Sequence, residues 1–197
     1  NNTAYDNGED GLAIISSNGT SVSGNTVYRN GWAGFRVEMS TGVNYLFNNS
    51  GNNNTNEGFL LNTANKTQVY NNTAMFNTGV GFRASNSSNS IIANNTALWN
   101  LGNGFSISTG SDGGIFSGNN ATNNSQNGLN VFSSNKLVIT GNALSNNSNY
   151  GLDLFTSAGN SIINNTARGN LVLGMYLQIL TSSSVSYNRI SESGNSG

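Results

Sequence analysis

The sequence contains no cysteine, no histidine and no proline. Without cysteine the chain forms no disulfide and offers no thiol for catalysis. Without histidine it lacks the usual general base and the usual transition-metal ligand. The three methionines, Met39, Met75 and Met175, are scattered along the chain. We therefore expect no cofactor and no metal site.

Charge is also scarce, because only 8% of the residues are charged and the net charge is −1. A nucleic-acid-binding protein or an anionic-membrane-binding protein needs a basic surface, which this composition does not supply. No apolar run approaches the ~20 residues of a membrane span, so membrane insertion is not expected. Asparagine, in contrast, makes up about a fifth of the chain.

An internal repeat organises these residues. One asparagine, the anchor of each repeat, recurs at intervals of 23 or 24 residues: Asn2, Asn25, Asn49, Asn72, Asn95, Asn119, Asn142, Asn165 and Asn188. A second asparagine follows five residues after every anchor except the last. A glycine stands nine residues after every anchor, from Gly11 to Gly197. Internal repeats of this length are typical of solenoid proteins.

Apolar residues follow the same register. The residue after the glycine is Leu, Phe or Met, and the residue two positions later is usually aliphatic, as in Phe82 and Ala84 or Phe105 and Ile107. A spacing of two indicates a strand with one buried face. We predict an all-β, single-stranded right-handed parallel β-helix over residues 1–197, with three short strands per coil and about nine coils, the last partial. Stacking buries the apolar face that a single repeat cannot bury alone.

The asparagines and glycines have expected roles in this fold. An anchor such as Asn72 tolerates the left-handed conformation of a corner, and its amide can hydrogen-bond from coil to coil. The glycine is expected where a positive φ or a close backbone approach excludes a side chain.

The pattern N-x(4)-N-x(3)-G-[FLM]-x-[aliphatic], followed by [IVL]-x-x-N, resembles right-handed parallel β-helix repeats of the pectin-lyase-like superfamily. It also resembles the Asn-rich repeats of the nitrous-oxide-reductase maturation factor and of archaeal and bacterial surface proteins. The resemblance covers the whole chain and implies the fold. It leaves function open, because such coils serve lyases, hydrolases, epimerases, adhesins and structural proteins.

Two columns of the strand after the glycine are expected to face outward, where catalytic groups would stand. Their only acidic residues, Glu38 and Asp153, lie five coils apart, which is about 24 Å. Glycoside hydrolysis needs two carboxyl groups within about 5–10 Å, so no catalytic pair is expected. Arg36, Glu38 and Arg83 form a charged cluster, which is either a set of solvated ion pairs or a contact for a sugar acid.

Aromatic residues outside the core columns are further candidates. Tyr28, Trp32 and Trp99 are candidate contacts for a carbohydrate or a protein partner, because exposed aromatic rings stack on both. For Trp99 and its neighbour Phe76, an alternative is that they fold over a corner and complete the core.

The eighth coil differs from the others in its corners. Apolar residues replace polar ones there and predict a cover or an end interface: Leu171, Val172, Leu173, Ile179 and Leu180. Because no atypical capping segment is present and unpaired strand edges invite pairing, we expect a fragment of a longer rod or chains that stack end to end.

Sequons for N-glycosylation arise repeatedly just before the anchor asparagine. The candidate sites share one repeat position: Asn1, Asn48, Asn71, Asn94 and Asn164. The repeat itself generates them, so whether sugar is attached depends on the compartment.

The leading functional hypothesis is a non-catalytic structural or adhesive module of a secreted or cell-surface protein, with the periplasm as another location. Under this hypothesis the protein is not expected to be an enzyme. The alternative is a polysaccharide-binding or polysaccharide-cleaving β-helix. A third hypothesis, ice binding through an outward Thr column, is weakened by Asn120 and Ala143, which interrupt that column.

Overall fold

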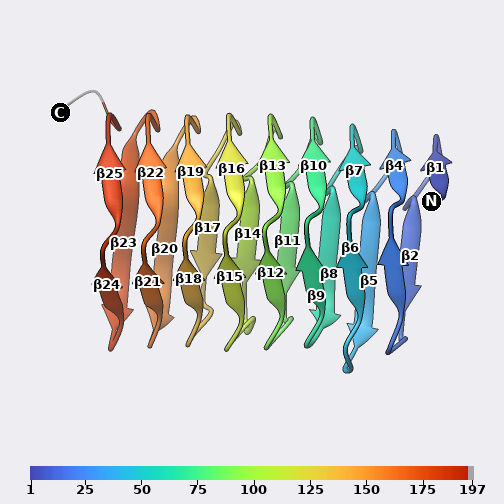
Figure 1. Ribbon diagram of the computed structural model, residues 1–197, viewed down its shortest axis with the longest axis horizontal. Coiled ribbons are helices and arrows are strands. Elements are labelled where there is room, and N and C mark those ends of the chain that lie inside the picture. Colours follow the sequence, from blue (N-terminus) through green and yellow to red (C-terminus); the bar gives the residue numbers. More distant parts are fainter. Residues whose placement is uncertain (195–197) are drawn as a thin grey trace.

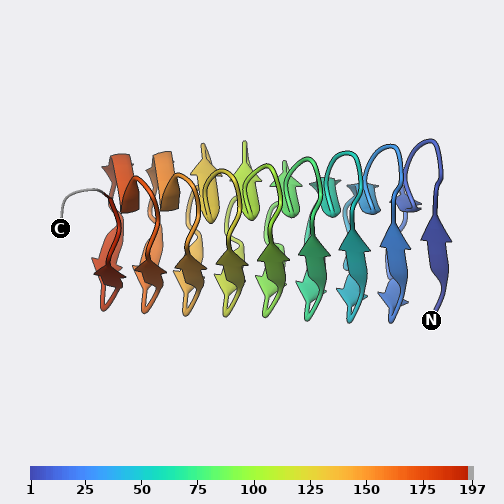
Figure 2. The ribbon, with the colours of Figure 1, turned by 90° about the horizontal axis from the view of Figure 1, so that it is seen from above.

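The computed structural model describes residues 1–194, and these residues contain 25 strands and no helix. Three parallel sheets run the length of the molecule, and each coil adds one strand to each sheet. Figure 1 shows the coils side by side in a row, with β1 and β25 at opposite ends. Figure 2 shows the same row from above, each coil displaced along one axis. The predicted all-β parallel β-helix with three strands per coil is confirmed.

The first sheet follows each anchor asparagine and has the strands β1 (Thr3–Tyr5), β4 (Thr26–Tyr28), β7 (Ser50–Asn52), β10 (Thr73–Met75), β13 (Thr96–Leu98), β16 (Asn120–Thr122), β19 (Ala143–Ser145), β22 (Thr166–Arg168) and β25 (Arg189–Ser191). The second sheet follows the glycines and has the strands β2 (Leu12–Ile15), β5 (Phe35–Ser40), β8 (Phe59–Ala64), β11 (Phe82–Ser85), β14 (Phe105–Ser108), β17 (Leu129–Phe132), β20 (Tyr150–Ala158) and β23 (Leu173–Thr181). The third sheet precedes the next anchor and has the strands β3 (Ser21–Ser23), β6 (Tyr45–Phe47), β9 (Gln68–Tyr70), β12 (Ile91–Ala93), β15 (Ile115–Ser117), β18 (Val138–Thr140), β21 (Ser161–Ile163) and β24 (Ser184–Ser186). Eight coils are complete, and β25 is the single strand of the partial ninth.

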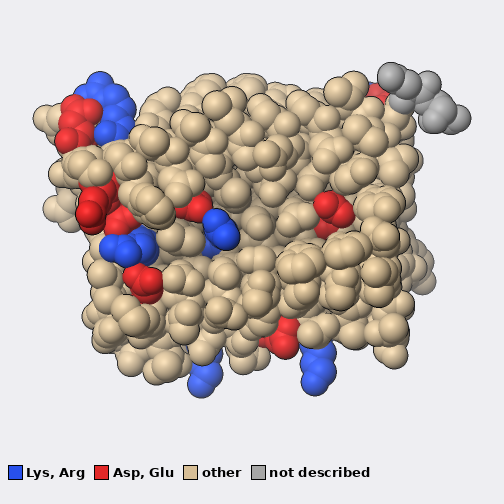
Figure 3. All heavy atoms as spheres, turned by 180° about the vertical axis from the view of Figure 1, so that it is seen from behind, with Lys and Arg blue, Asp and Glu red and all other residues tan. Residues whose placement is uncertain are grey.

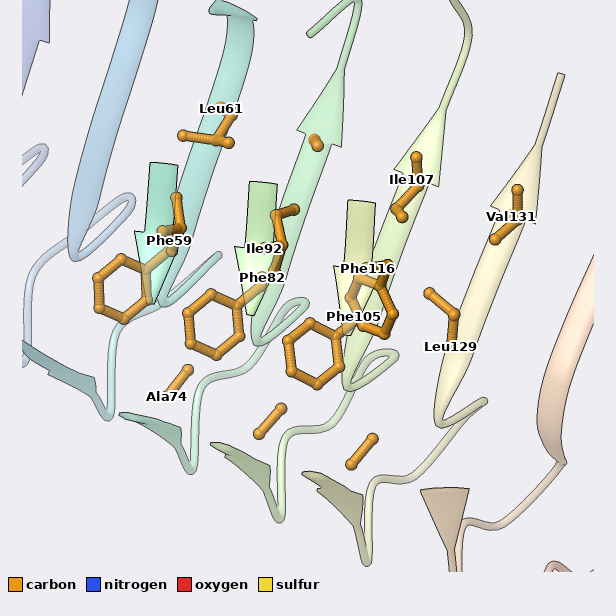
Figure 4. Packing of buried hydrophobic residues seen from close by; sticks show 14 of the residues in the cluster. Phe59, Leu61, Ala74, Phe82, Ile92, Phe105, Ile107, Phe116, Leu129 and Val131 are labelled. Carbon is orange, nitrogen blue, oxygen red and sulfur yellow. The ribbon is translucent and has the colours of Figure 1, made fainter. Parts of the chain in front are cut away.

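The core is a stack of identical positions from successive coils. In the second sheet Phe82 pairs in register with Phe59 on one side and Phe105 on the other. The Phe59 and Phe82 ring centroids lie 4.6 Å apart and those of Phe82 and Phe105 4.9 Å apart. Figure 4 shows these three rings side by side, with Leu129 continuing the row in the next coil. The alternation of buried and outward residues thus produces one continuous apolar core.

Two ladders of asparagine amides run inside the corners on either side of the first sheet. The backbone N–H and side-chain Nδ2 of Asn72 both donate to Oδ1 of Asn95, at 2.9 and 3.0 Å. Nδ2 of Asn72 also donates to the carbonyl of Leu46 at 2.8 Å. Asn77 and Asn100 repeat the arrangement at the next corner. The expected coil-to-coil amide bonding is confirmed.

The expected left-handed conformation of the anchor is wrong, since it belongs to the preceding residue. Asn71 has φ 56° and Asn94 has φ 55°, whereas Asn72 and Asn95 are not among the residues with positive φ. The exposed residue makes the turn, and the anchor then points its amide inward, where its donors and acceptors are used.

The repeated glycine is explained by close approach and not by positive φ. A Cβ built at Gly81 would lie 2.6 Å from the carbonyl oxygen of Gly104 and 2.9 Å from Nδ2 of Asn100. Gly81 is not among the glycines with positive φ. Gly197, the last member of this column, lies outside the described residues.

Candidate functional site

The outer face of the second sheet carries a groove near the N-terminal end of the rod, which we call the Trp32 groove. It is a hollow of about 330 Å³ lined by Trp32, Asn56, Glu57, Leu60, Asn62, Arg83 and Ser85. A second hollow of about 190 Å³, the Asp10 hollow, is lined by Gly8, Glu9, Asp10, Trp32 and Arg36. Trp32 lines both and is 50% exposed. Figure 3 shows that acidic and basic side chains gather in this part of the face, on the left of the view.

The repeat explains why the groove forms there. The corner position before the second sheet holds Trp32 in the second coil, Asn56 in the third and Gly79 in the fourth. The backbone keeps these residues in register, because the N–H of Asn56 donates to the carbonyl of Trp32 at 3.1 Å and the N–H of Gly79 to that of Asn56 at 3.0 Å. The large side chain of Trp32 is therefore followed by the smaller one of Asn56 and by Gly79, which has no side chain. This decrease in size leaves space beside the indole.

Arg36 and Glu38 belong to one chain of ion pairs that also includes Asp10. Nε of Arg36 lies 2.7 Å from Oδ2 of Asp10, and Nη1 of Arg36 donates to Oε2 of Glu38 at 2.9 Å. The first contact is a close ion pair without hydrogen-bond alignment, since Nε makes no hydrogen bond. Oε1 of Glu38 accepts from Nδ2 of Asn62 at 2.8 Å. These contacts hold one side of the groove in a fixed polar arrangement.

Arg83 does not join Arg36 and Glu38 but pairs with Glu57. Nη1 of Arg83 donates to Oε1 of Glu57 at 3.2 Å. The Glu57 side chain is only 3% exposed, whereas that of Arg83 is 47% exposed. The other oxygen of Glu57, Oε2, is buried and has no hydrogen-bond partner. The lining of the groove therefore includes an ion pair between a buried carboxylate and a half-exposed guanidinium.

Asp153 lies on the same sheet, far along the rod in the seventh coil. Its Oδ2 accepts from Nδ2 of Asn130 at 2.9 Å and from Nδ2 of Asn127 at 3.2 Å. Partial burial raises the pKa of the Asp153 carboxyl, and the two amide hydrogen bonds oppose that rise. The structure does not bring Asp153 together with Glu38.

The other predicted aromatic contacts lie away from the groove. Tyr28, on β4, stacks on Tyr5 with ring centroids 5.2 Å apart, and the Arg29 guanidinium carbon lies 5.0 Å from the Tyr28 ring centroid. Trp99, at the corner after β13, stacks on Phe76 with centroids 5.2 Å apart. Trp99 is 44% exposed and Phe76 51% exposed, so the alternative that they complete the core is wrong.

The candidate glycosylation sites all lie on the surface. Asn1, Asn48, Asn71, Asn94 and Asn164 are exposed. Four of them, from Asn48 onward, occupy the left-handed corner conformation. The ladder asparagines that follow these four, Asn49, Asn72, Asn95 and Asn165, are buried, so a sugar on the exposed residue would not disturb the ladder.

The apolar residues of the eighth coil are mostly exposed. Leu171, Val172, Leu173 and Ile179 belong to this group. Leu180 differs, because it is partly buried and packs against the core. The expected cover or end interface at this coil stays a prediction.

The chemistry available at the Trp32 groove is hydrogen bonding and aromatic stacking. Carboxylate, amide, guanidinium and hydroxyl groups surround an exposed indole there. Across residues 1–194, no three acidic, histidine or cysteine side chains are grouped so as to hold a metal ion. The same residues contain no helix long and apolar enough to cross a membrane.

Glu57 is the groove residue that the sequence pattern does not single out. It stands directly before the repeated glycine, in a column that also contains Asp10, Ala33, Val80 and Asn103. This column precedes the strand, so it is not one of the two outward columns of the strand. Its signal is an acidic residue at a position where most other coils carry apolar or amide side chains.

Comparison with solved structures shows the same fold in longer proteins. A variant of the periplasmic alginate epimerase AlgG superposes with a TM-score of 0.69 and 15% identity, over 96% of this chain and 60% of that one. The Azotobacter vinelandii mannuronan C-5 epimerase AlgE4 A-module gives 0.66 and 11%, over 98% and 76%. Pectate lyase Pel9A gives 0.55 and 17%, over 93% and 56%. The chain thus spans about 60% of the AlgG length.

None of the curated proteins matches this sequence. The family model described as "Right handed beta helix region" matches residues 57–197, which is more than half of the chain. The repeat, the three parallel sheets and this match agree, and the chain belongs to the right-handed β-helix family.

Proposed function

We propose that this chain is a polysaccharide-binding β-helix module of a secreted, periplasmic or cell-surface protein, and that it binds its ligand in the Trp32 groove. The observation that carries the proposal is the position of Trp32, half-exposed between two polar hollows. Sugar rings bind proteins by stacking an apolar ring face on an aromatic side chain while their hydroxyls bond to polar groups around it. The Trp32 groove offers both kinds of contact.

The similar structures support this proposal only in a general way. The names of those proteins contain alginate, mannuronan and pectate, and all three are polysaccharides. At these low sequence identities, the similar structures indicate the fold of this chain but not the role of any residue. The structural or adhesive role expected from the uniform repeat is compatible with a binding groove, because a rigid rod that holds a glycan is an adhesive element.

The test is affinity electrophoresis of the purified chain in gels that contain single polysaccharides. We expect retardation by at least one polymer and a loss of affinity of at least tenfold, about 1.4 kcal/mol, in Trp32→Ala. Trp99→Ala is the matched control, since Trp99 is a similarly exposed corner tryptophan outside the groove and its loss should change nothing. Equal binding by the chain and Trp32→Ala would contradict the proposal, as would the absence of binding to every polymer.

The same polymers should also be incubated with the chain and analysed for new reducing ends and for unsaturated sugars. Cleavage that Glu57→Gln or Arg83→Ala abolishes would favour the lyase or hydrolase alternative over a binding module. Unchanged polymers that nevertheless retard the chain are the result expected for binding alone.

A further inference from the structure

We propose that two copies of this chain associate side by side and antiparallel along the corner that follows the first sheet. The contact surface is one row of residues, the corner row, each four positions after an anchor asparagine, from Asp6 in the first coil to Glu192 in the ninth. Figure 1 shows these corners in a line along the upper edge of the view, above the strands from β1 to β25. The surface is separate from the Trp32 groove, which lies on the second sheet.

The middle of the corner row is apolar and exposed. Phe76 in the fourth coil is 51% exposed and Trp99 in the fifth is 44% exposed, and their rings stack with centroids 5.2 Å apart. Leu101, two residues after Trp99, is 59% exposed. Met75 and Leu98, which directly precede the two aromatic residues, pair in register and are partly buried. Exposed apolar clusters mark contacts with other macromolecules, and aromatic residues are enriched at the centre of protein interfaces.

The backbone conformation makes the two aromatic residues unfavourable for an isolated chain. Every member of the corner row has a left-handed backbone, with φ 57° at Phe76 and 51° at Trp99. Asparagine and glycine tolerate this conformation better than bulky residues do. Backbone strain that persists at an exposed position indicates a function for the side chains there. Residues that suit the conformation occupy the row in four other coils: Asn53, Asn123, Asn146 and Gly169.

Charged side chains stand near the two ends of the row. In the first two coils Nη2 of Arg29 lies 2.7 Å from Oδ2 of Asp6. In the last two coils Nε of Arg168, one residue before the row, lies 2.9 Å from Oε2 of Glu192. All four side chains are more than half exposed. Coils three to seven have no charged residue in the row or in the position before it, so the charges flank an uncharged centre.

An antiparallel pair related by a two-fold axis between the fourth and fifth coils matches this order of residues. It sets Phe76 against Trp99 of the second copy in the centre. It also sets the first coil against the eighth, so that Asp6 faces Arg168 of the second copy at both ends of the contact. The two ends are seven coil spacings apart, which is about 34 Å. The same surface thus complements itself, as a two-fold interface requires.

Other arrangements of two copies lose this match. With the axis on the fifth coil, Asp6 would face Glu192 and Arg29 would face Arg168. With the axis on the fourth coil, Asp6 would face the seventh coil, which has no charge in the row. In a parallel pair each coil would face the same coil of the second copy, and every charge would meet its own kind. Because like charges across an interface are unfavourable, they select the antiparallel register between the fourth and fifth coils.

The test is sedimentation of the purified 197-residue chain over a range of concentrations. We expect a reversible monomer–dimer equilibrium with a dissociation constant in the micromolar range, as for a small interface. Phe76→Gly combined with Trp99→Asn introduces residue types that the row has in other coils. This variant should keep the circular dichroism spectrum and the thermal stability of the unchanged chain but dimerise at least tenfold more weakly. Phe132→Ala is the matched control, because Phe132 is 42% exposed and stacks on Phe155 on the second sheet.

Charge reversal tests the register. Arg168→Glu should weaken the dimer severalfold, because it sets a carboxylate opposite Asp6 of the second copy. Asp6→Arg combined with Arg168→Glu exchanges the two charges and should restore the affinity. Failure of this exchange to restore the dimer would overturn the antiparallel register.

Two further results would overturn the self-association itself. One is a chain that stays monomeric at every concentration, and the other is a dimer that the folded aromatic variant leaves unchanged. Polysaccharide binding is measured at concentrations where the chain is monomeric, so it is decided separately. A monomeric chain whose polysaccharide binding depends on Trp99 would show that a ligand, and not a second copy, covers the centre of the corner row.

Discussion

At the scale of single residues, most polar side chains inside this rod are held by identical neighbours. Asn95 illustrates this, because its Nδ2 donates to the carbonyls of Val69 and Ala93 and to Oδ1 of Asn119. Its own Oδ1 accepts from Asn72. Every buried donor and acceptor of the ladder is therefore used, and the ladder places no free polar group in the interior. Glu57 is the contrast, since its Oε2 is buried without a hydrogen-bond partner.

Asp153 is the residue for which pH should change stability. Its pKa in the folded chain is raised by burial above the ordinary 3.8, so folding favours the protonated carboxyl. Stability from this group is fully present below the ordinary pKa and is lost as the pH rises through the raised one. Asp153→Asn keeps an oxygen that accepts from Asn127 and Asn130 but carries no charge.

We therefore expect Asp153→Asn and the unchanged chain to be similarly stable at pH 3 and the variant to be more stable at pH 7. Urea unfolding followed by circular dichroism across this range measures the difference. The other carboxyl groups titrate in both proteins and cancel in the comparison. A difference in stability that is independent of pH, or a variant that is less stable at pH 7, would contradict this prediction. It would show that burial is not the main influence on the pKa of Asp153.

At the scale of the coil, the glycine before the second sheet sets how closely successive coils stack. A Cβ at Gly81 would lie 2.6 Å from the Gly104 carbonyl oxygen and 3.0 Å from the Cβ of Ala97. Backbone and core atoms of the next coil cannot move away without lengthening the strand pairs. We expect Gly81→Ala to lower the free energy of unfolding by about 1–3 kcal/mol, the usual cost of overpacking.

The matched control is Gly8→Ala. A Cβ at Gly8 would have no atom within 4 Å, and Gly8 is not among the positive-φ glycines. Its substitution should leave the urea midpoint unchanged within about 0.5 kcal/mol. If both substitutions lowered the free energy of unfolding equally, the close spacing of successive coils would not be the reason for the glycine at this position.

At this scale, the sequence predicts the features that recur in every coil. The ladders of Asn72 and Asn77 and the core column of Phe82 follow from the period, because each member has the same neighbours. The sequence places the left-handed conformation one position too late, at Asn72, because Asn71 and Asn72 have the same side chain and only φ distinguishes them. The Trp32 groove arises where coils differ from one another. The repeat does not predict which unlike side chains of different columns come into contact. The pairing of Glu57 with Arg83 therefore could not be predicted from it.

At the scale of the molecule, stability should vary along the rod, because each coil contacts only its neighbours. The strands of the fourth coil, β10, β11 and β12, pair on both sides, and their inward residues Ala74, Phe82 and Ile92 are buried. β1 and β24 pair on one side only, and near the C-terminal end Val185 is 48% and Ile190 54% exposed. Opening an outer coil breaks one interface, whereas opening a central coil breaks two.

Native-state hydrogen exchange resolves this difference in the 197-residue chain. Amide protection should rise from the first coil toward the central coils and fall again toward the eighth, since exchange reports the free energy of each local opening. The amides of Thr96 and Phe82, which donate to Asn72 and Gly104 at 2.9 and 3.0 Å, should be among the slowest. The amide of Thr26, which donates to Asn2 at a similar 2.9 Å, should exchange faster, because its bond can break by the opening of the first coil alone. Uniform protection along the chain would mean that all coils unfold together, and the stacking interfaces would then be much stronger than the differences between coils.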